Sequence, residues 1–235
     1  MILDQMDTGR QLLGLLQFSD SFFPTGGFSQ SYGLETYVQY GLVDGGGSFR
    51  EVLTTFIDHV LGREDGLAVS LTWKAATAED YSTLVQIDQI LSSTKMARES
   101  RTASVKTGCR TLRTAGPLLD APIIWEYLKL IETGFCSGHH AMAFGLVGCC
   151  AGLTLKQTTL GYLYNAVAAM VNNGVRLIPL GQQEGQYILW DLIPLLNRVA
   201  SEIPWKTLDN LGSTAPALEI RPMQHERLYA RLFMS

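Results

Sequence analysis

Hydrophobic residues recur along this chain with the three-and-four spacing of helices that bury one face. The clearest run follows the glycine loop at 45–47, where Ser48 and Glu51 have the spacing of a capping box. The apolar residues after that cap lie on one helical face: Phe49, Val52, Leu53, Phe56, Ile57, Val60 and Leu61. This pattern predicts a helix from residue 48 to residue 61.

The same periodicity predicts further helices. The sequence has no pattern of paired strands and no βαβ alternation. The predicted helices cover residues 29–40, 67–76, 80–92, 95–113, 123–133, 139–153, 155–173 and 186–200. We expect helix 95–113 to stop at Gly116-Pro117 and Pro194 to kink or shorten the last helix. Thr154 is the expected cap between two helices of a hairpin. The predicted fold class is all-α, a single-domain helical bundle of about eight to ten helices.

The C-terminal part of the chain has a different composition. Residues 203–222 contain three prolines and a Gly-Ser-Thr cluster, which predict an extended connector. Beyond it, Leu228, Leu232 and Phe233 form a short apolar stripe at helical spacing. We therefore expect one domain over residues 1–235, in which residues 203–235 form a connector and a partner-binding tail.

Small residues line one face of the helix predicted at 139–153. They recur every three or four positions: Gly138, Ala141, Gly145, Gly148 and Gly152. Glycine costs a helix about 1 kcal/mol relative to alanine, so such a face indicates close packing by another helix. The spacing leaves open whether that neighbour belongs to the same chain or to a second subunit.

Composition and charge indicate a globular protein and argue against a nucleic-acid-binding or membrane-spanning one. The chain has 235 residues, 46% hydrophobic content and a net charge of −4, which suits a globular domain and argues against nucleic acid as a partner. The uncharged run at 141–155 is shorter than the roughly 20 residues of a membrane span, and no targeting segment is evident at the N-terminus. Four cysteines without a CxxC pair indicate a reducing, cytoplasmic compartment.

The helix predicted at 95–113 is strongly basic. One acidic residue, Glu99, stands among six cations: Lys95, Arg98, Arg101, Lys106, Arg110 and Arg113. Such a helix is either a solvated face or an electrostatic docking surface for an acidic partner.

The sequence contains no complete motif for phosphate binding or for catalysis. The glycine-rich segments 24–29 and 45–50 lack the Lys-Ser/Thr pair of a phosphate loop, so no cofactor is expected. His59 has no nucleophile near it in sequence, and the His225-Glu226 pair lacks the second histidine of a zinc protease. We expect no catalytic residues and no enzyme activity.

One group of side chains has the chemistry of a transition-metal site. Cys136, His139 and His140 combine sulfur with imidazole at short spacing. Glycines at 134 and 138 make a helical arrangement of all three doubtful, and no carboxylate lies near them in sequence. A metal site at these residues stays the less favoured of two interpretations, the other being buried polar side chains at the start of a helix.

Four segments in order resemble the family of the urease accessory protein UreF. They are FPTGGFSQSYGLETYV at 23–38, RESRTASVKTGCR at 98–110, VRLIPLGQQEGQ at 175–186 and IRPMQHERLYARLFMS at 220–235. The resemblance implies an all-α, homodimeric, non-catalytic protein. It also implies a scaffold that bridges UreD (also called UreH) and the GTPase UreG and assists GTP-dependent nickel insertion into apo-urease.

The resemblance also implies that Phe28, the aromatic after the glycine turn, and Arg231 in the tail recruit UreG, and that the tail becomes ordered on UreD. Arginine and tyrosine in the tail have the composition of an interface anchor. The predicted partner-binding residues are Phe28, Ser29, Tyr32, Glu35, His225, Glu226, Arg227, Tyr229, Arg231, Leu232 and Phe233. Neither nucleic acid nor membrane is an expected partner. The alternative function is a metallochaperone that carries nickel itself on Cys136, His139 and His140.

Overall fold

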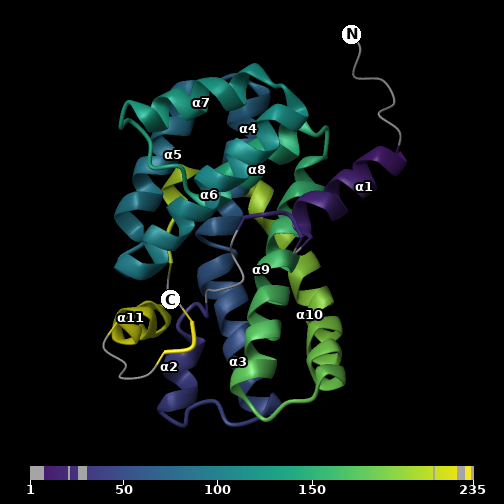
Figure 1. Cartoon of the computed structure of the whole chain (residues 1–235), viewed down its shortest axis with the longest axis vertical. Coiled ribbons are helices and arrows are strands. Elements are labelled where there is room, and N and C mark those ends of the chain that lie inside the picture. The colour runs from purple at the N-terminus through teal and green to yellow at the C-terminus, as the bar shows by residue number, and fades with distance from the viewer. Residues whose placement is uncertain (1–7, 21, 26–30, 214, 227–230, 234–235) are drawn as a thin grey trace.

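The computed structural model describes residues 8–20, 22–25, 31–213, 215–226 and 231–233. Within these residues the fold is all-α without a strand, as predicted, and ten helices have ten or more residues (Figure 1). The α-helices are α1 (Thr8–Ser19), α2 (Leu34–Gln39), α3 (Gly46–Phe56), α4 (Asp65–Thr77), α5 (Tyr81–Thr94), α6 (Arg98–Leu119), α7 (Pro122–Glu132), α8 (His140–Cys150), α9 (Leu155–Leu177), α10 (Gln182–Glu202) and α11 (Pro216–His225). Three shorter helical turns are η2 (Ile57–Leu61), η3 (Ile203–Trp205) and η4 (Leu208–Asn210).

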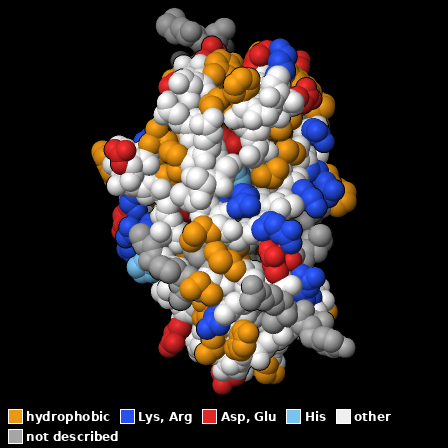
Figure 2. All heavy atoms as spheres, turned by 90° about the vertical axis from the view of Figure 1, so that its left-hand side faces the viewer, with side chains coloured by type: hydrophobic (Ala, Val, Ile, Leu, Met, Phe, Trp, Pro, Cys, Tyr) orange, Lys and Arg blue, Asp and Glu red, His pale blue; other side chains and the backbone are white. Residues whose placement is uncertain are grey.

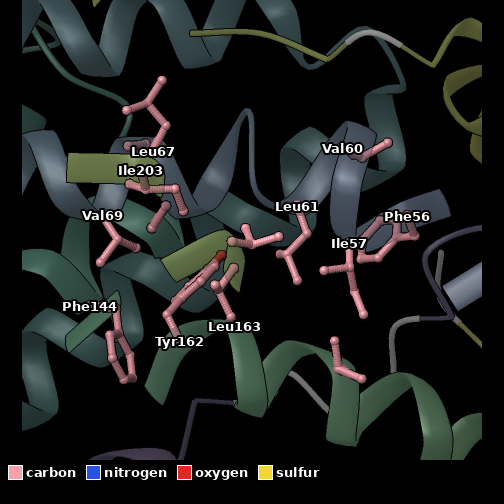
Figure 3. Close-up of a cluster of buried hydrophobic side chains, with 14 of the residues drawn as sticks. Phe56, Ile57, Val60, Leu61, Leu67, Val69, Phe144, Tyr162, Leu163 and Ile203 are labelled. Atoms are coloured by element: carbon pink, nitrogen blue, oxygen red, sulfur yellow. The ribbon is translucent and has the colours of Figure 1, made fainter. Parts of the chain in front are cut away.

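Helix α8 lies at the centre of the upper half of the molecule, where α4, α6 and α9 pack around it (Figure 1). Every residue from Ala141 to Gly148 is buried, so this helix has no polar face to turn toward water. Below it, α3 and η2 pack against α9 and α10. Side chains such as Ile57, Leu163 and Ile203 join these layers into one core (Figure 3).

The glycine face of α8 is used within the chain. A Cβ on Gly145 would lie 2.8 Å from the carbonyl oxygen of Val69 in α4, and one on Gly148 would overlap the Thr158 side chain in α9. The neighbouring helices therefore approach where side chains are missing. This answers the question that the sequence left open, because the partner of the glycine face is the chain itself.

The helix predicted at 48–61 is present with its predicted buried face, but its two ends differ. It begins at Gly46, because the Ser48 hydroxyl accepts hydrogen bonds from the N–H groups of Asp44 and Gly45 instead of acting as the N-cap. Its last turn is the π-helical η2, in which the N–H of Gly62 donates to the carbonyl of Ile57 at 2.9 Å. At this end a Cβ on Gly62 would lie 2.6 Å from the Val199 side chain of α10, a close approach that residue spacing does not predict.

The expected stop of α6 at Gly116-Pro117 and the expected shortening of α10 at Pro194 are both wrong. Helix α6 starts three residues later than predicted and continues past Pro117, and α10 keeps its full length across Pro194. A proline removes a single backbone hydrogen bond, and packing on both helices outweighs that loss. The hairpin of α8 and α9 agrees with prediction, since the N–H of Gln157 donates to the Thr154 hydroxyl at 3.2 Å.

The segment 203–222 is not the extended connector that we expected. It forms η3, η4 and most of α11. Pro204 and Pro216 stand in the first turns of η3 and α11, where a missing N–H costs no helical hydrogen bond. Two of the three prolines in this segment therefore start helices, whereas Pro222 lies inside α11. Helix α11 packs against α2 (Figure 1).

No helix among the described residues has both the length and the apolar composition to cross a bilayer. The longest helix, α9, spans 23 residues but includes charged and polar positions such as Lys156, Asn172 and Arg176.

Candidate functional site

Helix α2 begins in a turn shaped for close contact with α11. Tyr32 and Gly33 both have left-handed backbones, with φ of 52° and 79°. A Cβ on Gly33 would lie 2.8 Å from the ring of Pro222, so glycine is required both by its backbone and by its neighbour. The Thr36 hydroxyl then donates to the carbonyl of Arg221 at 3.1 Å. These contacts place the start of α2 directly against α11.

The Arg221 guanidinium strengthens the same contact. It lies 5.3 Å from the ring centre of Tyr37 and 5.4 Å from that of Tyr40, within the range of cation–π attraction. It also donates to the side chain of Gln224 at 2.7 Å. Helix α11 is thereby held in a fixed orientation, and its last residue, His225, faces inward.

The His225 side chain is fully buried between two carboxylates. Its Nε2 lies 3.0 Å from Oε2 of Glu35, and its Nδ1 lies 2.8 Å from Oε2 of Glu99. Ionised carboxylates only accept hydrogen bonds, whereas a neutral imidazole has a single N–H to donate. Both contacts are satisfied together when the ring carries two protons and a positive charge.

Glu35 also receives the end of the chain. Its Oε1 accepts a hydrogen bond from the N–H of Leu232 at 2.7 Å, and its Oε2 accepts one from the N–H of Phe233 at 3.2 Å. Burial by itself would raise the pKa of this carboxyl, but the two N–H donors and His225 outweigh burial and lower the pKa below its ordinary 4.5. Glu35 is therefore ionised at neutral pH and anchors the tail.

Glu99 completes the arrangement from α6. Its Oε1 accepts a hydrogen bond from the Arg231 guanidinium at 2.7 Å, while its Oε2 faces His225. Glu99 thus contacts both His225 and Arg231. We call this group the tail clasp, and it consists of Glu35, Glu99, His225, Arg231 and the N–H groups of Leu232 and Phe233.

The tail clasp divides the end of the chain into an inner and an outer side. Phe233 is buried, whereas Leu232 is 67% exposed. The Arg231 side chain is 41% exposed, so its guanidinium faces water while it pairs with Glu99. At the rim, Arg98 pairs with Glu226 at 3.3 Å. A buried anchor beside an exposed arginine and leucine has the anatomy of a partner-binding edge.

The structure brings together five of the predicted partner-binding residues, Glu35, His225, Arg231, Leu232 and Phe233, with Glu226 beside them. Tyr32 is not part of this group and lines the neighbouring cavity instead. Phe28, Ser29, Arg227 and Tyr229 lie outside the described residues. Glu99 and Arg221 were missed. The signal for Glu99 was present, because it is the single acidic residue in a helix of cations.

A cavity of about 90 Å³ lies beside the tail clasp, with Pro222 of α11 in its wall. Lys95 reaches into it, and its Nζ lies 2.9 Å from oxygens of both Glu64 and Asp65. Burial opposes the charge on Lys95, but the two carboxylates raise its pKa above the ordinary value. Burial, followed by Asp65, raises the pKa of Tyr32 to about 12. Lys95 therefore belongs to a buried ion cluster and not to the basic face predicted for α6.

The three residues considered as metal ligands, Cys136, His139 and His140, make other contacts in the structure. His139 is buried, with Nε2 2.9 Å from the Ser92 hydroxyl and Nδ1 3.2 Å from that of Ser104. His140 packs its ring on Tyr162 with centres 5.3 Å apart, and burial raises the pKa of the Cys136 thiol to about 12. Across the described parts of the chain, no three His, Cys, Asp or Glu side chains gather as metal ligands.

The two histidines predict a pH-dependent stability. Burial lowers the pKa of both His139 and His140 to about 4, from an ordinary 6.5. The unfolded chain binds protons at these sites below pH 6.5, whereas the folded protein binds them only near pH 4. Stability is therefore complete above pH 6.5 and falls as the pH drops toward 4, by roughly 3 kcal/mol for each histidine.

Urea unfolding at pH 7.5, 6 and 5 measures this loss. The His140→Gln variant should show a shallower pH dependence than the wild type between pH 6.5 and 5, because one of the two titrating groups is gone. Identical slopes for the two proteins would contradict the assignment of His140 as a buried neutral side chain.

Comparison with known proteins gives a consistent answer. The sequence model of the UreF family matches residues 43–193. The urease accessory protein UreF of Bacillus sp. (strain TB-90) is 39% identical over 226 residues, which cover 96% of this chain and 99% of that protein. UreF of Actinobacillus pleuropneumoniae serotype 5b (strain L20) is also 39% identical, with the same coverage. UreF of Arthrobacter sp. (strain FB24) is 36% identical over 97% of this chain and 98% of its own.

Proposed function

Because the chain belongs to the UreF family of urease accessory proteins, we propose that it acts in urease maturation as a non-catalytic scaffold. In this role it bridges UreD and the GTPase UreG and assists the GTP-dependent insertion of nickel into apo-urease. The observation that carries the proposal is the tail clasp, which fixes the C-terminal residues against α2 and α6 with Arg231 at the surface.

The histidines support a non-catalytic role. His225 is enclosed by Glu35 and Glu99, and His139 lies between two serine hydroxyls with no exposed surface. Neither side chain is open to a substrate. His59 is exposed on η2. The described residues thus use two of these histidines to hold helices together.

The cellular setting and the oligomeric state form part of the same proposal. Four cysteines are free thiols, which suits the reducing cytoplasm. A homodimer has to use a surface other than the glycine face of α8, since α4 and α9 already fill that face.

Replacing Arg231 tests the outer side of the tail clasp. We expect Arg231→Ala to keep the fold, because the side chain is partly exposed, and to weaken the complex with UreD or UreG about 30-fold. That factor corresponds to the roughly 2 kcal/mol of an interface arginine. Titration calorimetry with each purified partner, together with urease activity in cells that co-express the accessory proteins, measures the effect.

The matched control is Arg176→Ala, which removes an exposed arginine near the end of α9, away from the clasp. It should bind both partners like the wild type. Full urease activation by Arg231→Ala would contradict a role of the tail clasp in assembly with UreD or UreG.

A further inference from the structure

Exposed cations form a row along the outer face of α6. Arg98, Lys106, Arg110 and Arg113 are all exposed and follow one another at spacings of three, four or eight residues, which keeps them on one side of the helix. Lys and Arg side chains gather at mid-height on the face that carries α6 (Figure 2). We call these four residues the α6 basic row. It spans roughly 22 Å at the helical rise of about 1.5 Å per residue.

The charges of this row are largely uncompensated. Across the described residues, Lys106, Arg110 and Arg113 have no ion pair, and Arg98 has only Glu226 while its side chain is 74% exposed. Two other exposed cations are matched, Arg50 with Asp191 at 2.7 Å and Arg198 with Asp58 at 2.6 Å. The exposed Arg10, Arg63, Lys156 and Arg176 also have no ion pair among the described residues, but they are spread over separate segments of the chain. A chain with a net charge of −4 therefore concentrates unpaired positive charge on one helix face.

An apolar patch adjoins the C-terminal end of the row. The indole of Trp125 in α7 packs onto α6 at Gly116, where a Cβ would lie 3.1 Å from the ring. Trp125 nevertheless keeps 39% of its surface exposed, and Leu118 keeps 58%. Arginine and tryptophan are the residue types that dominate binding energy at protein interfaces.

The N-terminal end of the row meets the tail clasp. Arg98 of the row and Glu99 of the clasp are neighbours in α6, and both pair with residues of the C-terminal segment, Glu226 and Arg231. A protein that contacts the exposed side of the tail clasp therefore also lies next to the α6 basic row. The two features form one continuous surface on α6.

We propose that the α6 basic row, with Trp125 at its end, is a docking surface for an acidic segment of a protein partner. Carboxylates spaced by about 5–6 Å, as on one face of a helix, would match the cations. The proposal rests on the function proposed above, and it adds the face and the charge of the partner. A protein segment fits better than nucleic acid or an anionic membrane, because a few carboxylates match a row of four cations and an apolar side chain can pack on Trp125, whereas an extended polyanion would also meet the net charge of −4 on the rest of the chain.

The test reverses the row while it keeps the fold. The variant Lys106→Glu/Arg110→Glu/Arg113→Glu changes three exposed residues. Its control, Arg10→Glu/Lys156→Glu/Arg176→Glu, makes the same change in net charge at exposed positions of α1 and α9. Association rates with immobilised cognate UreD and UreG are measured at 50 and 300 mM NaCl, after the melting temperature of each variant has been compared with that of the wild type.

We expect the row variant to associate at least tenfold more slowly than the control with one partner at 50 mM NaCl, and to lose most of its salt dependence. If the charge reversal unfolds the protein, the neutral variant Lys106→Gln/Arg110→Gln/Arg113→Gln should show the same slowing to a smaller degree. Equal rates for a folded row variant and the control would overturn the proposal.

Two further outcomes are informative. Failure of the wild type to bind either partner would overturn the proposed function, and the docking surface with it, whereas normal wild-type binding that the row variant retains overturns the docking surface alone. Submicromolar binding of the wild type to duplex DNA or to phosphatidylserine vesicles at 150 mM NaCl, abolished in the row variant, would overturn the choice of a protein partner.

Discussion

Glu35→Ala should lower the free energy of unfolding by about 3–5 kcal/mol, the cost of removing one partner from a buried ion pair. The substitution leaves the buried His225 with Glu99 alone and frees the N–H groups of Leu232 and Phe233. The end of the chain then loses its anchor on α2. Urea unfolding measures the loss of stability, and hydrogen exchange of the tail amides measures its release.

The same variant should also abolish urease activation, because a released tail no longer presents Arg231 in a fixed place. Glu51→Ala, at an exposed position of α3, is the control and should change stability by less than about 0.5 kcal/mol. A Glu35→Ala protein with wild-type stability and protected tail amides would show that Glu35 does not hold the tail.

Gly108→Ala should be a severely destabilising substitution, because the added methyl group meets backbone atoms at close range. The new Cβ would overlap the carbonyl oxygen of Gly138 and lie 2.6 Å from the carbonyl carbon of His139. These are backbone atoms of the segment that leads into α8, so no side chain can rotate away. We expect a loss of about 3 kcal/mol or more, at the upper end of the range for overpacking, or failure to fold.

Gly14→Ala is the matched control, because nothing lies within 4 Å of the added Cβ in α1. It should leave stability unchanged or raise it by up to about 1 kcal/mol. Thermal melting of the two variants compares them directly. Equal melting temperatures for Gly108→Ala and Gly14→Ala would contradict the close approach of α6 to the start of α8.

Local patterns predicted most helices because each buries one apolar face, which periodicity records directly. The helix after Gly45 and the Thr154 hairpin are examples. Errors arose where distant contacts decide the outcome. Lys95 lies before the start of α6 and pairs with two carboxylates about thirty positions away. Helix α6 continues through Pro117 because α7 and α8 pack against its inner face.

The candidate site was predicted in part for a similar reason. The composition of the tail and the resemblance to UreF pointed to His225, Arg231 and Phe233 as binding residues. Their partners were not predictable as contacts, because Glu35 lies 190 positions from His225 and Glu99 lies 132 positions from Arg231. The use of prolines to start helices in 203–222 was also missed, since the same residues are typical of extended connectors.

We propose that this chain joins UreD and UreG into one complex. Size-exclusion chromatography with light scattering of the purified chain, cognate UreD and UreG with GTP and Mg²⁺ tests it most directly. We predict a single species that contains all three proteins and does not form when the chain is omitted. A mixture of UreD and UreG that associates equally well without the chain, or a chain that elutes alone, would contradict the scaffold.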